Sequence, residues 1–342
     1  MDYSIFDYLA YYKNYTFDEV KFNEVDALLY SIIAYVPIDE LRDNSSIKSL
    51  NNITSTLRGS GNMSTLAINV IKVMADSIRY KNVRLYHLVK EYNEEIEFGA
   101  LTFRDNNYTF IGFQGSIGTM AGWRENLYLT INFPTASQDR SVKYVKDVVR
   151  LKDRNLYIGG HSKGGNLALA SLLLAPRYVA RRVVKVYNFD GPGFRNEEVK
   201  SEKYKELKDK MVNILPDGSV IGMLLQHEEY HFIKSRSISI EKHFPNNWAV
   251  FGQFFVEGEE TKSSKAFDNK VELGLSKLTY EERKQFIDTI FEFMKEKKIS
   301  SLKDISKLDI EDIKGIISSM KNLSSDKKKI VLDTAKAFIK NK

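Results

Sequence analysis

The segment around Ser162 has the residue types that expose a serine hydroxyl for nucleophilic attack. A short apolar run at 156–158 is followed by Gly160-His161-Ser162-Lys163-Gly164-Gly165 and then by small residues and leucines up to Pro176. This order predicts a strand, a sharp turn and a buried helix, which is the context of a nucleophile elbow. Glycine permits the turn, and the N–H groups at the helix start can stabilise an oxyanion. A glycine-rich turn without a catalytic role can carry the same Gly-x-Ser-x-Gly pattern, but the expected strand and helix favour the catalytic interpretation.

Two aspartates follow expected strands after the serine. A site of this kind needs an acid next in the chain and a histidine last, each at the end of a later strand. Asp190 follows the strand expected over 182–189, and Asp217 follows the one expected over 211–215. Asp217 lies where the acid of these sites is usually found, so it is our preferred acid. Asp190 is the runner-up, because an aspartate that opens a glycine-proline turn commonly bonds its own backbone.

The general base is inferred by elimination among five histidines. His161 lies inside the elbow, and His87 precedes the serine, which breaks the expected order. His227 and His231 lie in what the alternation suggests is a surface turn that enters a strand. His243 stands on a loop after the last expected strand, which is the required place. We therefore expect His243 to be the base and keep His227 as the second candidate.

Stabilisation of a tetrahedral intermediate takes two backbone N–H donors, and loss of one such donor typically raises the barrier by about 3 kcal/mol. The first is expected from Lys163, the residue after the serine. The second is expected from Ser116 in the Gln114-Gly115-Ser116 loop, which follows a strand expected over 108–113. Gly115 permits close approach of that loop. An ordinary turn at the end of a strand is the alternative interpretation.

These motifs resemble those of the class 3 lipases, the triacylglycerol-lipase-like branch of the α/β-hydrolases. That family carries a Gly-His-Ser-Leu-Gly-Gly elbow and an earlier Phe-Arg-Gly-Ser/Thr loop, which correspond here to the elbow given above and to Phe113-Gln114-Gly115-Ser116. The segment 123–127 is similar to the tryptophan-containing stretch that those lipases place in and behind the lid. The resemblance implies Ser162 as nucleophile, Ser116 as oxyanion residue, Asp217 as acid and His243 as base.

A closer resemblance covers roughly residues 1–256. Segments 22–28, 219–225 and 243–248 resemble a group of bacterial proteins assigned to the same lipase-like clan. The chain departs from the true lipases at Lys163, which replaces the usual leucine, and at Gln114, which replaces the arginine. We expect the Lys163 cation to lie near the site, which disfavours a neutral triglyceride. The implied mechanism needs neither a metal nor an organic cofactor.

The composition is that of a folded protein. At 342 residues, with 43% hydrophobic and 12% aromatic residues, the chain can bury the core of one large domain with an appendage, or of two domains. It contains no cysteine, which excludes disulfides, cysteine nucleophiles and thiolate metal sites. The N-terminus lacks the pattern of a secretion signal, and the apolar runs are too short to span a membrane. We expect a cytoplasmic protein without a transmembrane segment.

The net charge of +6 comes from the C-terminal region. Residues 261–342 hold 19 Lys and Arg against 13 Asp and Glu, so the rest of the chain is neutral. Helical phasing predicts amphipathic helices around 286–294, 309–320 and 325–339. Such helices either pack on one another or on the neighbouring domain, or they contact an anionic membrane surface, and the first interpretation is the more common one. No pattern indicates nucleic-acid binding.

The order of elements predicts the fold class. Much of 1–80 reads as helix, with pieces at 17–20, at 23–35 and from Asp39, and would cover one face of a sheet. Further strands are expected at 84–91, 97–103, 156–158 and 230–235, with helices at 141–150 and 166–175. A mostly parallel sheet with an antiparallel beginning and flanking helices is the α/β-hydrolase fold. The expected domains are 1–256 for the hydrolase unit, 257–264 for a linker and 265–342 for a helical appendage.

The sequence thus predicts a serine hydrolase that cleaves an ester or related acyl bond of a small-molecule or lipid substrate. The segment 116–138 borders the expected site and is either a mobile lid or a fixed helix and loop. Two other functions stay open. One is a catalytically inactive protein with this fold that serves as a binding module at a membrane surface. The other is acyl transfer to an acceptor other than water.

Overall fold

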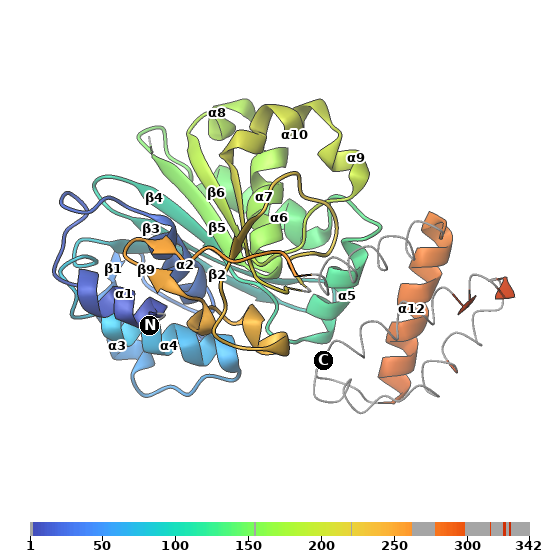
Figure 1. Cartoon of the computed structure of the whole chain (residues 1–342), viewed down its shortest axis with the longest axis horizontal. Coiled ribbons are helices and arrows are strands. Elements are labelled where there is room, and N and C mark those ends of the chain that lie inside the picture. Colours follow the sequence, from blue (N-terminus) through green and yellow to red (C-terminus); the bar gives the residue numbers. More distant parts are fainter. Residues whose placement is uncertain are drawn as a thin grey trace.

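An eight-stranded sheet forms the centre of the molecule (Figure 1). A computed structural model describes residues 3–153, 155–219, 221–261 and 278–297, together with residues 315, 324, 325, 328 and 329. The strands lie side by side in chain order. They are β1 (Ser45–Ser46), β2 (Arg84–Tyr92), β3 (Glu97–Arg104), β4 (Thr109–Phe113), β5 (Leu156–His161), β6 (Val183–Phe189), β7 (Met211–Pro216) and β8 (His231–Ile233).

The direction of the strands changes at β4. Strands β1 to β4 pair antiparallel, and each pair from β4–β5 to β7–β8 is parallel. Parallel neighbours need crossover connections, and helices supply them between β4 and β7. This is the α/β-hydrolase fold with an antiparallel beginning, as the sequence predicted.

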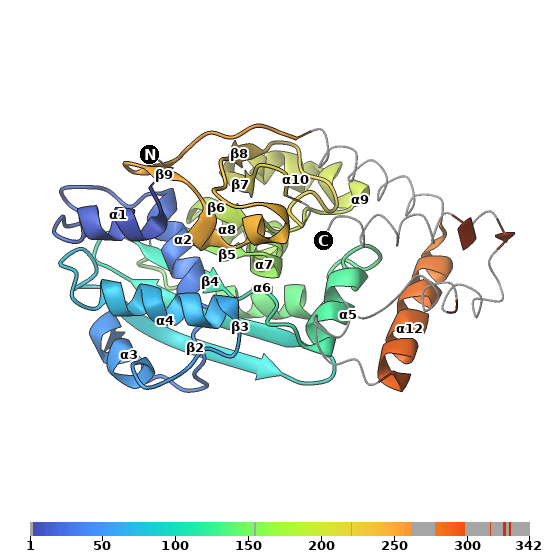
Figure 2. The same ribbon diagram turned by 60° about the horizontal axis from the view of Figure 1, so that its bottom comes forward.

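Helices cover both faces of the sheet (Figures 1 and 2). One face carries α1 (Ile5–Tyr12), α2 (Glu24–Ile33), α3 (Ile47–Thr54) and α4 (Asn62–Met74). The other carries α6 (Ala136–Val148), α7 (Lys163–Leu174), α8 (Arg177–Ala180), α9 (Asn196–Val199) and α10 (Glu202–Leu207). Each set of helices closes its own apolar core against the sheet, so the expectation that the first 80 residues cover one face is confirmed.

The layer formed by α1 to α4 is held by a buried ion pair as well as by apolar contacts. Arg79 Nη2 lies 2.5 Å from Asp26 Oδ2, and both side chains are fully buried. The hydroxyls of Tyr8 and Tyr80 donate to the other oxygen of Asp26, at 3.0 and 2.7 Å. A buried charge is tolerated only with such partners, so these contacts fix α2 relative to α1 and to the segment after α4.

Several shorter elements and one further helix complete the described part of the fold. They are α5 (Met120–Tyr128), the 3₁₀ helices η1 (Lys208–Lys210), η2 (Ser239–His243) and η3 (Pro245–Asn247), the hairpin strands β9 (Val250–Phe251) and β10 (Phe254–Phe255), and α12 (Tyr280–Glu296). Figures 1 and 2 show α12 beside α5, and the Tyr128 hydroxyl donates to Asp288 Oδ1 at 2.6 Å. No described helix combines the length and apolar character needed to cross a membrane.

Several boundaries differ from the expected ones because of local capping. Helix α6 begins at Ala136 rather than at 141, since Thr135 and Gln138 form a capping box. Helix α7 begins at Lys163, directly after the serine, rather than at 166. Residues 17–20 form a turn, and no helix begins at Asp39.

The C-terminal expectations are only partly covered by the described residues. Helix α12 contains the phased segment 286–294, whereas the helices expected at 309–320 and 325–339 lie, apart from single residues, outside the described part. The first residues of the expected linker pair with β8. Glu257 forms an antiparallel bridge with Ile233, and the Gly258 amide donates to the Phe232 carbonyl at 2.8 Å.

Candidate active site

Ser162 occupies a strained turn between β5 and α7. Its φ of 59° and ψ of −133° are unusual for a residue with a side chain, and such strain is typical of functional turns. The serine stands at the N-cap of α7, yet its side chain makes no capping hydrogen bond. Ser162 is partly exposed, whereas the side chains on either side of it are buried. The strand, sharp turn and helix expected from the sequence are therefore present, with a partly exposed serine between them.

His243 pairs with a buried aspartate. Its Nδ1 lies 2.6 Å from Asp190 Oδ2, and the Asp190 side chain is only 1% exposed. The other oxygen of Asp190 accepts hydrogen bonds from the Ser219 hydroxyl and, at 3.1 Å, from the Gly222 amide. With all these partners the carboxylate is held in one orientation, and it in turn fixes the His243 ring.

In the structure His243 contacts Asp190, the runner-up, and not Asp217, the preferred acid. Asp217 Oδ1 lies 3.1 Å from the Lys242 ammonium and accepts from the Ser235 amide at 3.2 Å. Neighbouring residues of η2 therefore reach different aspartates, Lys242 to Asp217 and His243 to Asp190. The turn after β6 does not need the Asp190 side chain, because Asn188 Oδ1 accepts from the Gly191 amide at 3.0 Å.

His161 brings His243 to the elbow. Its Nε2 lies 2.8 Å from the His243 carbonyl oxygen, which can only accept, so Nε2 carries the proton. The two imidazole rings have centroids 4.5 Å apart. Burial lowers the pKa of His161 well below its usual value, and the nearby His243 adds to this effect. Trp248 Nε1 donates to the Lys242 carbonyl at 2.7 Å, so the loop with His243 is held at two points.

His227, the second candidate for the base, lies elsewhere and is not in a surface turn. Its ring is buried, and Nε2 donates to the Gly222 carbonyl at 3.2 Å. Burial lowers the pKa of His227 to about 4. A neutral imidazole that bonds the backbone in this way supports the loop around Gly222, which itself bonds Asp190. His227 therefore bonds the loop that contacts Asp190, whereas His243 contacts the Asp190 carboxylate itself.

The loop expected to complete the oxyanion hole lies against the elbow. A Cβ atom on Gly115 would come within 3.1 Å of Ser162 Cβ and closer still to the Tyr35 hydroxyl, so only glycine fits there. Ser116 follows, and its hydroxyl accepts from Asn126 Nδ2 of α5 at 3.1 Å. Lys163 is the first residue of α7, where the backbone N–H has no partner within the helix. The two expected donors thus come from neighbouring segments.

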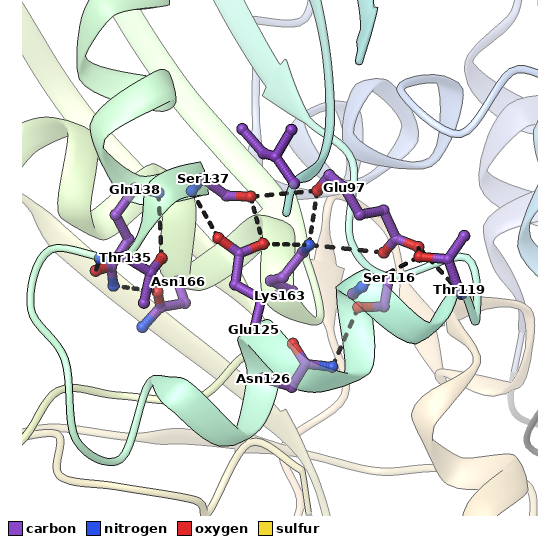
Figure 3. Close-up of polar contacts among 12 residues, drawn as sticks. Glu97, Ser116, Thr119, Glu125, Asn126, Thr135, Ser137, Gln138, Lys163 and Asn166 are labelled. Atoms are coloured by element: carbon purple, nitrogen blue, oxygen red, sulfur yellow. Dashed lines mark hydrogen bonds and ion pairs between the residues drawn. The ribbon is translucent and has the colours of Figure 1, made fainter. Parts of the chain in front are cut away.

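The Lys163 side chain turns away from the elbow into the interior. It is 1% exposed, and Nζ donates to the Glu97 carbonyl at 2.6 Å and to Glu125 Oε2 at 3.0 Å (Figure 3). The cation expected near the site is therefore buried and paired with two carboxylates. The sequence did not identify Glu97 and Glu125, although a lysine on an otherwise apolar helix signals a buried acidic partner.

A cavity of about 200 Å³ borders the oxyanion loop. Its lining includes Tyr35, Ile38, Gln114 and Ile117, which combine apolar surface with a few polar groups. Lys90 also lines this cavity, its ammonium donates to the Ala34 carbonyl at 2.7 Å, and burial lowers its pKa to about 7. Within the described residues, no cluster of three His, Cys, Asp or Glu side chains could hold a metal ion.

The family comparison spans the site. The Mbeg1-like family model matches residues 74–292, which include the elbow, Asp190 and His243. No curated protein matches the sequence. Among solved structures, the M37 lipase is 12% identical over 58% of this chain and 67% of its own, with a TM-score of 0.37. The Lip2 lipase from Yarrowia lipolytica is 12% identical over 69% of this chain and 97% of its own, with a TM-score of 0.36. Because the family model covers more than half of the sequence, the chain belongs to the Mbeg1-like family.

Proposed function

We propose that this protein is a serine hydrolase that cleaves an ester or a related acyl bond. Ser162 attacks the carbonyl carbon, and His243 takes the hydroxyl proton and later returns it to the leaving group. Asp190 orients the imidazole and stabilises its charged form. The amides of Ser116 and Lys163 donate to the oxyanion, and water then hydrolyses the acyl-enzyme.

The observation that carries this proposal is the 2.6 Å contact between His243 Nδ1 and the buried Asp190 carboxylate, beside a strained serine. A carboxylate on Nδ1 leaves Nε2 as the nitrogen that can accept the serine proton. The Ser162 side chain makes no capping hydrogen bond to α7, and the residue is partly exposed. These features support nucleophilic catalysis more directly than they support a binding module, which needs no such pair.

The test uses a fluorophosphonate probe and a short p-nitrophenyl ester, chosen because the cavity beside the oxyanion loop is small. The wild-type protein should react with the probe and hydrolyse the ester, and Ser162→Ala should abolish both. Asp190→Asn should lower kcat about 10⁴-fold, since the amide favours the wrong imidazole tautomer.

Asp217→Asn is the matched control, because it makes the same change at the acid that pairs with Lys242 instead. Its kcat should stay within about tenfold of the wild-type value, an effect smaller than that of a triad residue. If Asp217→Asn loses activity and Asp190→Asn does not, the assignment of the acid fails. A wild-type protein that neither reacts with the probe nor hydrolyses esters would favour the binding module. Faster release of p-nitrophenol from the ester with an added alcohol would favour acyl transfer.

A further inference from the structure

A buried ion cluster lies directly behind the nucleophile. We call Lys163, Glu97 and Glu125 the Lys163 cluster. Lys163 Nζ lies 3.0 Å from Glu125 Oε2 and 3.6 Å from Glu97 Oε1, and none of the three side chains is more than 5% exposed (Figure 3). Two carboxylates this close repel each other in a medium of low dielectric constant, so the single cation holds them together.

Glu97 connects the cluster to the oxyanion loop. Its Oε1 accepts from the Ile117 amide at 3.2 Å, and its Oε2 accepts from the Thr119 amide at 3.2 Å and from the Thr119 hydroxyl at 2.5 Å. Ile117 follows Ser116 directly. The Glu97 carboxylate therefore fixes the backbone directly after Ser116, whose amide is one of the proposed oxyanion donors.

Glu125 connects the cluster to α5 and, through it, to the same loop. Its carboxylate accepts from the Ser137 amide at 2.6 Å and from the Ser137 hydroxyl. The next residue, Asn126, donates to the Ser116 hydroxyl at 3.1 Å. The Ser116 segment is thus fixed by contacts through Glu97 and through α5, and Lys163 pairs with the carboxylate in each of these two connections (Figure 3).

We infer that Lys163 is a positioning residue for the oxyanion hole: its amide is one donor, and its buried ammonium places the other donor, Ser116, through Glu97 and Glu125. This inference rests on the proposed hydrolase function. It accounts for the position of the lysine, since the residue after the serine pairs with both carboxylates through its side chain while its amide is a proposed oxyanion donor. Oxyanion donors must be preorganised, and a shift of about 1 Å can cost about 100-fold in rate.

The test compares Lys163→Met with the wild-type protein in ester hydrolysis. Methionine keeps the length and removes the charge, so the two carboxylates must separate or take up a proton. We expect kcat to fall by about 10- to 100-fold while KM changes less than about threefold, because the donors act on the transition state. The affinity for a short alkylboronic acid, which mimics the tetrahedral intermediate, should fall in parallel with kcat/KM. Glu125→Gln, a milder change, should show the same pattern and serves if Lys163→Met does not fold.

Arg104→Met is the matched control. Arg104 and Asp153 form another buried pair, 3.3 Å apart, at the opposite end of β4 from the oxyanion loop. Its loss should lower stability but leave kcat within about threefold of the wild-type value, since it touches neither donor. Equal losses of kcat in Arg104→Met and Lys163→Met would mean that Lys163 has only a structural role, which would overturn the inference. An unchanged kcat in both Lys163→Met and Glu125→Gln would overturn it as well. An inactive wild-type protein would instead overturn the proposed function.

Discussion

His227 makes the stability of this protein sensitive to acid. The imidazole is buried, donates to the Gly222 carbonyl at 3.2 Å and packs edge-on against Tyr230 with ring centroids 5.1 Å apart. Burial lowers the pKa of His227 from 6.5 to about 4, against the opposing effect of its backbone hydrogen bonds. Between these two pH values the unfolded chain binds a proton that the folded protein excludes. Stability therefore falls as the pH drops through this window.

The size of the effect follows from the two pKa values. One pKa unit corresponds to about 1.4 kcal/mol, so the difference between 6.5 and about 4 corresponds to about 3 kcal/mol of folding free energy at pH 7 that is lost by about pH 4. Below pH 4 both states carry the proton and the contribution no longer changes. The pKa of His161 is lowered by burial as well, so His161 acts in the same direction.

The assay is urea unfolding of the wild-type protein and of His227→Gln at several pH values between 7.5 and 4. Glutamine cannot titrate but keeps an N–H that can reach the Gly222 carbonyl. The variant should lose about 3 kcal/mol less than the wild type over this range, whatever its stability at pH 7. Carboxylate titrations are common to both proteins and cancel in the comparison. Curves that stay parallel within about 0.5 kcal/mol would refute the reasoning, because His227 would then have a similar pKa in both states.

Two further predictions test single contacts. Gly115→Ala should lower kcat by about 100-fold, because the new methyl group would press on Ser162 and Tyr35, and Gly61→Ala, which has open space, should leave kcat unchanged. Full activity in Gly115→Ala would show that the loop can move aside. Arg79→Met should cost about 3–5 kcal/mol in urea unfolding, since it leaves the fully buried Asp26 carboxylate without its cation. A cost below about 1 kcal/mol would contradict the role given to this pair.

Periodicity and turn chemistry sufficed for most of the sheet. Strand β2 begins at Arg84 and β7 begins at Met211, as expected, and the elbow separates β5 from α7. Helix starts were less predictable. The capping box at Thr135 is visible in the sequence as Thr followed three residues later by Gln, but the polar first turn of α6 hides it from a search for apolar periodicity. Capping residues therefore locate the start of a helix whose first turn lacks apolar periodicity.

Chain order pointed to the proposed nucleophile and base, whereas it did not point to the proposed acid. Asp190 and Asp217 both end parallel strands and both lie in glycine turns. The choice depends on η2, where Lys242 and His243 point to different aspartates. Tertiary packing decides which residue of this short 3₁₀ helix faces which strand end, and here the contacts come from Trp248 and His161. The sequence alone did not reveal this orientation of η2.

The buried pairing of Lys163 changes what the site can be expected to bind. A free ammonium beside the serine would attract anionic substrates and disfavour neutral ones, which is what the sequence suggested. Because the Lys163 ammonium is buried beside the Glu97 and Glu125 carboxylates, the cluster presents no excess positive charge to the proposed site. The charge nearest to that carbonyl then comes from the His243 and Asp190 pair and from backbone N–H groups, which act on any acyl group alike. For the proposed hydrolase, we expect the shape of the small cavity beside Gln114 and Ile117 to discriminate among esters.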